Sequence, residues 1–312
     1  MDMDYLSIYF LFALWIDSMT ANRPALKWGV KRRLAFIEFR LFWEGRVNRS
    51  DIIDQFDVSV PQASKDFSLY QELAPENARY NKSEKCYVAN TPFTPIFLSK
   101  DPDDYLSRLR LLADNVIEES KSWIAQVPDV DVGITPRRKM DTRVLRAVLD
   151  AIHSMCSLRI FYQSMSPERP DPIWREIEPH AFGHDGFRWH IRAYCCETSE
   201  FRDFLLPRIL KVSSGSKAAA NRQDDTLWHD KVPIKIAPHP DLAPSQQAIV
   251  AKDYGMKNGK TTLRVRYAML FYLLKRLNLL DDASKRPART QHIVAVNPDD
   301  LRAALKKANF SL

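Results

Sequence analysis

Residues 59–70 have the sequence SVPQASKDFSLY, and this stretch predicts the fold of the N-terminal part of the chain. Ser59 can cap a helix, Gln62 stands at the third position of a capping box, and Pro61 is tolerated in the first turn. Helical spacing separates apolar from polar residues. The expected apolar face holds Val60, Ala63, Phe67 and Tyr70, and the expected outer face holds Gln62, Lys65, Asp66 and Leu69.

Two further helices are expected immediately before this one. Residues 31–45 (KRRLAFIEFRLFWEG) are apolar around most of the helical wheel, which is typical of a helix buried on several sides, and Gly45 ends it. Residues 49–56 (RSDIIDQF) restart a helix for which Ser50 is the expected N-cap. Two helices, a tight turn and a third helix with a polar outer face indicate a helix-turn-helix.

Residues 78–81 and 85–89 are expected to form the two strands of a wing beside that motif. The major groove of DNA admits a helix whose first residues reach base edges, so Gln62 suits adenine and Lys65 suits guanine or phosphate. A helical hairpin with a solvated outer face is the plain alternative. The candidate DNA-contacting residues are Arg49, Ser59, Gln62, Ser64, Lys65, Ser68, Arg79, Lys82 and Lys85.

The charge and composition fit this interpretation. The chain has 312 residues, 45% of them hydrophobic, and a formal net charge of +7 that is concentrated in residues 23–50. A basic balance favours polyanionic partners. The four cysteines form no C-x-x-C pair, so neither zinc nor a disulfide framework is expected and a reducing cytoplasm fits best.

The N-terminal stretch 5–16 (YLSIYFLFALWI) is strongly apolar but too short for a membrane span, which needs roughly 20 residues. It is either a packed helix or a segment upstream of the natural start, which would then be Met19. Neither alternative predicts a membrane protein.

The expected fold class is multidomain α+β. A linker helix is expected over 102–124, a small antiparallel barrel or curled sheet over the strand-rich region from 157 to 212, and a small α+β module behind it. The predicted domains are an N-terminal extension (1–26), a winged helix-turn-helix (27–95), a helical linker (96–140), a strand domain (141–225) and a C-terminal module (226–312).

A second candidate site lies in the strand domain. Strand alternation in residues 187–194 sends His190 and Arg192 to one face, and the same spacing predicts a single face for Arg202, Phe204, Leu206 and Arg208. Arginines beside aromatic rings suit phosphates and stacked bases, whereas the plain alternative is a solvated outer face. The candidate ligand-binding residues are Tyr162, Ser164, His180, His190, Arg192, Phe204 and Arg208.

Catalytic motifs are not found. The sequence contains no phosphate-binding P-loop, no dinucleotide fingerprint, no H-E-x-x-H and no G-x-S-x-G, so neither an enzyme nor a bound cofactor or metal is expected. The rival from another class is a nucleotide-processing enzyme that uses the basic pocket. A DNA-binding motif does not fix the sign of regulation, so a transcriptional activator is a second rival.

The order of a winged helix-turn-helix and a strand domain containing Trp189-His190-Ile191 and Pro207-Arg208-Ile209 resembles the WYL-domain transcriptional regulators. The segments FIEFRLFWEGRVNRSDI, SVPQASKDFSLYQ, RWHIRAYC and HPDLAPSQQAIV are similar to the CapW/BrxR type, from about residue 27 to the C-terminus. One departure is that His190-Ile191 replaces the Tyr-Leu of the name-giving triplet.

The resemblance implies a homodimeric repressor that binds an inverted-repeat DNA operator. It implies that the gene lies beside a phage-defence operon. It also implies an Sm-like barrel in the strand domain, which takes a nucleotide or nucleic-acid effector. The C-terminal module is implied to contribute to dimerisation.

Overall fold

The computed structural model describes residues 26–133 and 138–309, so the stretch 5–16 and the candidate start Met19 lie outside the described residues. The chain divides at residue 134 into two compact units, which are described separately. Within the described ranges, no helix is both long enough and apolar enough to cross a membrane.

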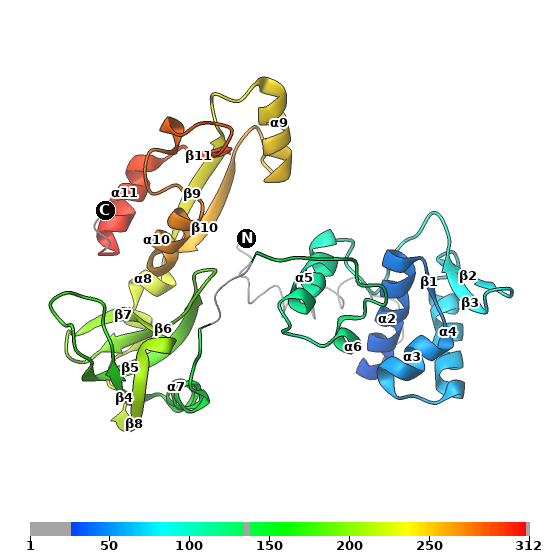
Figure 1. The fold of residues 1–312 in the computed structure, drawn as a ribbon, viewed down its shortest axis with the longest axis horizontal. Coiled ribbons are helices and arrows are strands. Elements are labelled where there is room, and N and C mark those ends of the chain that lie inside the picture. Colours follow the sequence, from blue (N-terminus) through cyan, green and yellow to red (C-terminus); the bar gives the residue numbers. More distant parts are fainter. Residues whose placement is uncertain (1–25, 134–137, 310–312) are drawn as a thin grey trace. The chain divides into compact units, whose positions relative to one another are not determined.

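The first unit contains the three helices expected from the sequence (Figure 1). Their bounds are α2 (Trp28–Glu44), α3 (Arg49–Phe56) and α4 (Val60–Leu73). Gly45 ends α2 in the left-handed conformation at φ 76°, and its N–H donates to the Leu41 carbonyl. Leucine, isoleucine and phenylalanine side chains of all three helices form one core.

The N-cap of α3 differs from the expectation. The capping residue is Asn48, whose side chain accepts the N–H of Asp51 while the Asp51 carboxylate accepts the N–H of Asn48. Ser50 is the second residue of the helix, and its hydroxyl donates to the Asn48 side chain. Asn48 is the N-cap rather than Ser50 because Asp51 lies three residues after it and completes a reciprocal capping box.

A small antiparallel sheet lies beside the helices. Its strands are β1 (Arg46–Val47), β2 (Ala78–Asn81) and β3 (Cys86–Ala89), in the order β1-β3-β2. The rings of Tyr87 on β3 and Phe67 on α4 stack with their centroids 4.1 Å apart. The sheet is therefore fixed to the same helix that carries the candidate recognition residues.

The linker helix expected over 102–124 is interrupted. The structure has α5 (Pro102–Ala113) and a single turn α6 (Glu119–Ser122), separated where Asn115 adopts a positive φ of 52°. Trp123, directly after α6, packs edge-on against Phe36 and Phe39 of α2 at 5.8 Å. This packing returns the chain to α2, which a continuous helix would not do.

The second unit begins with α7 (Thr142–Ser154), which packs on an antiparallel five-stranded sheet of order β7-β6-β5-β4-β8. The strands are β4 (Cys156–Tyr162), β5 (Ile173–His184), β6 (Trp189–Cys195), β7 (Glu200–Leu205) and β8 (Ile209–Lys217). The fold is mixed α+β as expected. Among the described residues no backbone pairing joins the edge strands β7 and β8, so a closed barrel is not confirmed.

The C-terminal part of this unit is a three-stranded antiparallel sheet of order β10-β9-β11 that packs against helices (Figure 1). Its elements are α8 (Thr226–His229), β9 (Lys231–Pro238), α9 (Pro244–Asp253), β10 (Thr261–Arg266), α10 (Tyr267–Arg276), β11 (Ile293–Ala295) and α11 (Pro298–Lys307). Its apolar core is separate from that of the larger sheet.

Candidate functional site

Helix α4 turns one face to the core and leaves the other open. Ala63, Phe67 and Tyr70 are buried as expected, and the Ser59 hydroxyl caps the helix by accepting the Gln62 N–H at 3.4 Å. The other face of α4 is exposed or partly exposed, and it includes Pro61, Gln62, Ser64, Lys65 and Ser68. Val60 was expected on the buried face but is 58% exposed, because it is the first helical residue, one turn before Ala63.

Asp66 was expected on the outer face, and here the structure corrects the sequence. Its side chain is 2% exposed and forms a two-pronged ion pair with Arg33 of α2, at 2.6 Å from Nε and 3.1 Å from Nη2. A buried carboxylate needs such a partner, which explains its inward position. The Gln62 amide also donates to Asp66 at 3.1 Å, so one candidate reading side chain is held against the helix.

The basic candidates around α4 occupy three different elements. Lys82 and Lys85 are exposed at the turn between β2 and β3, and Arg49 is exposed at the first residue of α3. Arg79 on β2 is exposed and donates to the Asn90 side chain at 3.1 Å. The structure thus places the candidate DNA-contacting residues on α3, α4 and the wing of one compact unit.

A buried carboxylate that sequence reasoning did not single out fixes the position of α4. Glu38 of α2 accepts the backbone N–H groups of Ile96, Phe97 and Leu98 at 2.9, 2.6 and 2.9 Å. It also accepts the Tyr70 hydroxyl of α4 at 3.1 Å. Burial raises the pKa of Glu38, although these hydrogen bonds oppose the rise. The available signal was an acid flanked directly by apolar residues, Ile37 before it and Phe39 after it.

In the second unit, the strand register corrects the expected face of β7. The cross-strand partner of Arg192 is Asp203, and Phe204 lies opposite Ile191. Phe204 is therefore buried in the core rather than beside Arg192. Arg202 is exposed, whereas Phe204 and Leu206 are buried in one core. Because β7 ends at Leu205 and the short 3-10 helix Leu206–Arg208 breaks the alternation before Arg208, the four residues do not form the predicted face.

Arg192 is the centre of a buried ionic cluster. Its Nε and Nη2 donate to the two oxygens of Asp225 at 2.7 and 2.8 Å, and its Nη1 donates to Asp203 at 3.2 Å. The ring Nε2 of His180 lies 2.9 Å from the Asp225 carboxylate. The structure therefore brings His180 and Arg192 together as predicted, but around two carboxylates that the sequence did not reveal.

The two carboxylates respond differently to this environment. Burial acts to raise the pKa of Asp225, but hydrogen bonds from Arg192 and His180 outweigh it and hold the pKa at about 2. Burial raises the pKa of Asp203, and the attraction of Arg192 offsets only part of that effect. Asp225 is thus the more firmly charged partner of Arg192.

His190 belongs to a neighbouring cluster. Its Nε2 lies 3.0 Å from Asp185, which also accepts the Arg188 guanidinium at 2.7 Å. The ring of Tyr272 on α10 lies 4.6 Å from the His190 ring and 5.9 Å from the Arg188 guanidinium. These contacts connect the β5–β6 hairpin to the C-terminal helices.

The remaining ligand candidates are located elsewhere. Tyr162 and Phe204 meet edge to face at 5.2 Å in the core, and the Tyr162 oxygen accepts the Leu205 N–H. Ser164 follows β4 and accepts the Ser166 N–H, and Arg208 lies in the 3-10 helix. Among the described residues, none of these four makes a hydrogen bond or ion pair with Arg192. Of the seven candidates, only His180 and Arg192 thus share an ionic cluster, through Asp225.

A cavity of about 300 Å³ opens beside Arg192. The sheet side of its lining is Arg192, Glu200, Phe201, Arg202 and Asp203, and the C-terminal module contributes Leu227, Ala268, Tyr272, Ala308 and Asn309. Its volume is within the lower range of small-molecule sites. The pocket thus has a wall that the sequence analysis did not include.

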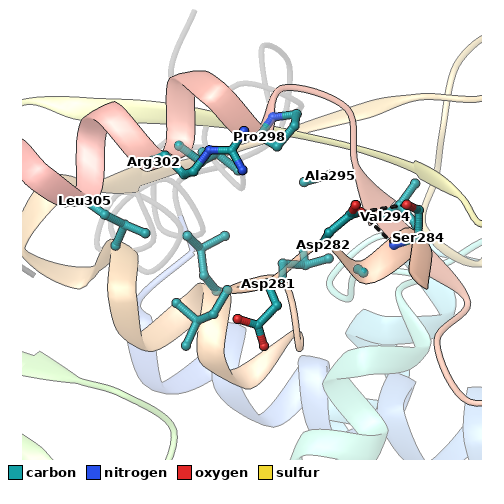
Figure 2. Close-up of a pocket in the computed structure, with 13 residues that line it drawn as sticks. Asp281, Asp282, Ser284, Val294, Ala295, Pro298, Arg302 and Leu305 are labelled. Carbon is teal, nitrogen blue, oxygen red and sulfur yellow. Dashed lines mark hydrogen bonds between the residues drawn. The ribbon is translucent and has the colours of Figure 1, made fainter. Parts of the chain in front are cut away.

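A larger cavity of about 390 Å³ lies within the C-terminal module (Figure 2). Leucines of α10, of the segment directly after it and of α11 form much of its lining, and Arg302 and Asp281 lie on opposite sides in Figure 2. Each charge already has a partner, because Arg302 pairs with Asp299 and Asp281 pairs with Arg286. Both ion pairs are solvent-exposed, so neither Arg302 nor Asp281 is a buried charge that needs a ligand.

The described residues contain no cluster of three or more histidine, cysteine or acidic side chains that could hold a metal ion. The four cysteines are free thiols. The carboxylates of Asp203 and Asp225 are paired with cationic side chains of the protein itself, so the arrangement is a buried ion-pair cluster around Arg192.

Three family models match successive parts of the chain. The winged helix-turn-helix domain of BrxR transcriptional regulators matches residues 29–111, the WYL domain matches 143–214, and the C-terminal dimerization domain of BrxR transcriptional regulators matches 231–301. These matches confirm the resemblance and the N-terminal winged helix predicted from the sequence.

Two relatives are similar over nearly their whole length, and both are described as the DNA-binding transcriptional repressor CapW. The protein from Stenotrophomonas maltophilia is 38% identical over 290 residues, which cover 92% of this chain and 96% of the relative. The protein from Escherichia coli strain KTE188 is 35% identical over 286 residues, covering 92% and 95%.

Among solved structures, the proteasome accessory factor B/C of Arthrobacter aurescens is similar at 18% identity and a TM-score of 0.28. The alignment covers 88% of this chain and 45% of that one. So low a score does not support a structural argument.

Proposed function

The chain belongs to the BrxR/CapW family of WYL-domain transcriptional regulators, and on that premise we propose that it is a homodimeric repressor of duplex DNA operators. The exposed ridge of α4 is the observation that carries the proposal. In it, Gln62, Lys65 and Ser68 project from a helix whose other face is buried.

The ridge enters the major groove and the wing grips the backbone. Gln62 is held by Asp66, which fixes the side chain before DNA binds and lowers the entropy lost on binding. Lys65 reaches a guanine or a phosphate, and Lys82 and Lys85 at the wing contact phosphates without reading sequence. A dimer with two such units spans an inverted repeat, with half-sites separated by whole helical turns.

A nucleotide or nucleic-acid effector at Arg192 releases the repressor. A buried arginine beside a cavity that two subdomains share can couple ligand binding to a change in their contact. The short 3-10 helix connects the two edge strands of the sheet directly, which supports an Sm-like barrel. The proposed domains are the winged helix-turn-helix (27–95), the helical linker (96–140), the strand domain (141–225) and the C-terminal module (226–312). The proposed regulatory target is a phage-defence operon.

The recognition face is tested by gel shift on DNA from the region upstream of the gene. Replacing Gln62 and Lys65 together by alanine is expected to abolish binding. The single K65A variant is expected to reduce the log–log salt slope by about 0.9 if Lys65 contacts a phosphate. The matched control is K211A, which removes an exposed lysine from the second unit. Unchanged binding by the double variant would refute this recognition face.

Repression is tested separately from binding. Transcripts of the neighbouring genes are compared in strains with and without the protein. Higher transcript levels in its absence are expected of a repressor, and lower levels would instead identify an activator.

A further inference from the structure

The segment between the larger sheet and the C-terminal module is held to the sheet by two buried carboxylates, Glu178 at its start and Asp225 near its end. β8 ends at Lys217 and β9 begins at Lys231. In the fully described stretch 221–230, Asp225 alone is buried, with 1% of its side chain exposed. Glu178 of β5 accepts the N–H groups of Ala219 and Ala220, which fixes the start of the segment.

Asp225 connects two parts of the second unit. On the sheet side it holds Arg192 through two hydrogen bonds of 2.7 and 2.8 Å and contacts the His180 ring at 2.9 Å. On the module side it caps α8 by accepting the Trp228 N–H at 3.2 Å. Trp228 in turn contacts the C-terminal module, because the Arg266 guanidinium lies 4.7 Å from its ring and donates to its carbonyl. In Figure 1, α8 lies between the larger sheet and α10.

The cavity beside Arg192 exposes this connection to a ligand. Arg192 and Asp203 are part of its lining, together with the ion-paired Glu200 and Arg202 of β7, Leu227 of α8 and Tyr272 of α10. Arg192 carries a single positive charge, which two carboxylates already face. A phosphate that approached the arginine would add a third anionic group, so like-charge repulsion opposes its entry while both carboxylates remain.

The two carboxylates are not equally free to move. Asp203 is the cross-strand partner of Arg192 in the paired strands β6 and β7, so its backbone is fixed on the sheet. Asp225 lies in a short segment outside the strands. Asp203 lines the cavity and Asp225 does not, so an anion that takes over the guanidinium of Arg192 would leave Asp203 in place on its strand and release Asp225.

We propose that the cavity beside Arg192 binds a phosphate-bearing ligand and that Asp225 is the internal anion which this ligand displaces. Displacement removes the ionic contact between the N-terminus of α8 and the sheet, leaving the edge-on contact of Trp228 with His180, and so loosens the attachment of the C-terminal module. The inference rests on the proposed release of the repressor by an effector, and it identifies the group that connects ligand binding to the module.

The experiment uses the full chain and inorganic pyrophosphate as the probe. Binding is measured by calorimetry, and mobility of the segment 221–230 by amide hydrogen exchange. D225N removes one charge but keeps a residue that caps helices well. It is expected to bind pyrophosphate at least about tenfold more tightly than the wild type, a difference of about 1.4 kcal/mol. Without pyrophosphate, amide exchange in segment 226–230 is expected to be faster in D225N than in the wild type. Adding pyrophosphate to the wild type is expected to speed up exchange in the same segment.

D203N is the matched control, because Asp203 is the other carboxylate on the same arginine. This variant is also expected to bind pyrophosphate more tightly than the wild type. Its exchange in 226–230 without pyrophosphate is expected to equal that of the wild type, since Asp225 still holds the segment. Each variant leaves Arg192 with one carboxylate, so neither leaves the buried cation unpaired.

Three results would overturn the inference. One is that D225N binds pyrophosphate no more tightly than the wild type, and another is that neither binds it at millimolar concentrations. The third is that saturating pyrophosphate leaves exchange in 226–230 unchanged.

A gel shift distinguishes this inference from the proposed function. A wild-type protein that fails to bind upstream DNA but shows the expected pyrophosphate results would refute the repressor and retain the displaced Asp225. The opposite pattern would retain the repressor and refute the displacement.

Discussion

Replacing Glu38 by alanine tests whether a single carboxylate positions the recognition helix. The substitution leaves the N–H groups of Ile96, Phe97 and Leu98 without their acceptor. It also removes the acceptor of the Tyr70 hydroxyl, which still accepts a hydrogen bond from Asn77. Each buried polar group left unsatisfied costs about 1–3 kcal/mol, and water will reach some of them in the half-buried segment. We therefore expect a loss of about 3–5 kcal/mol from the stability of the first unit.

Scanning calorimetry of the full chain is suited to this variant because the two compact units are expected to unfold as separate transitions. For a domain of this size, a loss of 3 kcal/mol corresponds to a decrease in melting temperature of about 10 °C or more. The transition of the second unit should stay in place. Amide exchange at residues 96–98 should rise at the same time.

Two companion variants sharpen the test. E38Q keeps one oxygen acceptor in place, so its loss is expected to be smaller than that of E38A. E72A, which removes an exposed acid from α4, is expected to change stability by no more than about 0.5 kcal/mol. If the melting temperature of the first unit is the same in E38A as in E72A, the role assigned to Glu38 is refuted.

Two further predictions concern a helix cap and the buried cluster. N48A should lower the stability of the first unit by about 1 kcal/mol, whereas S50A should have little effect; urea unfolding of both variants would reject the assigned cap if S50A proved the more damaging. The depressed pKa of Asp225 contributes about 2 kcal/mol of stability above pH 3.8, which is lost as pH falls towards 2. The second unit of D225N should therefore lose less stability than that of the wild type as the pH falls from 3.8 towards 2. Identical losses would contradict the assigned pairing.

The helices and the wing were predictable because they depend on local patterns. The apolar spacing of Ala63, Phe67 and Tyr70 indicates a buried face whatever lies opposite it. The cap of α3 was misplaced by two residues because Asn48 and Ser50 are both good capping residues, and only the contact with Asp51 decides between them.

The partners of buried charges were not predictable, because they are distant in sequence. Arg33 and Asp66 are 33 residues apart, and so are Arg192 and Asp225. Periodicity assigns a residue to a face but does not say what that face meets. Arg192 was therefore expected to form an open basic floor, whereas carboxylates from β7 and from the segment before α8 neutralise it.

The two buried carboxylates Glu38 and Asp225 differ in what they hold, and this difference fits their proposed roles. Glu38 accepts backbone N–H groups, which no soluble ligand can replace without unfolding residues 96–98. Asp225 holds a side-chain cation that lines a cavity, and a phosphate offers that cation the same two-oxygen geometry. The anchor of the DNA-binding unit is therefore permanent, and the anchor in the second unit is exchangeable. A repressor that answers an anionic ligand needs both kinds, because the recognition helix must stay rigid while the contact that senses the ligand must open.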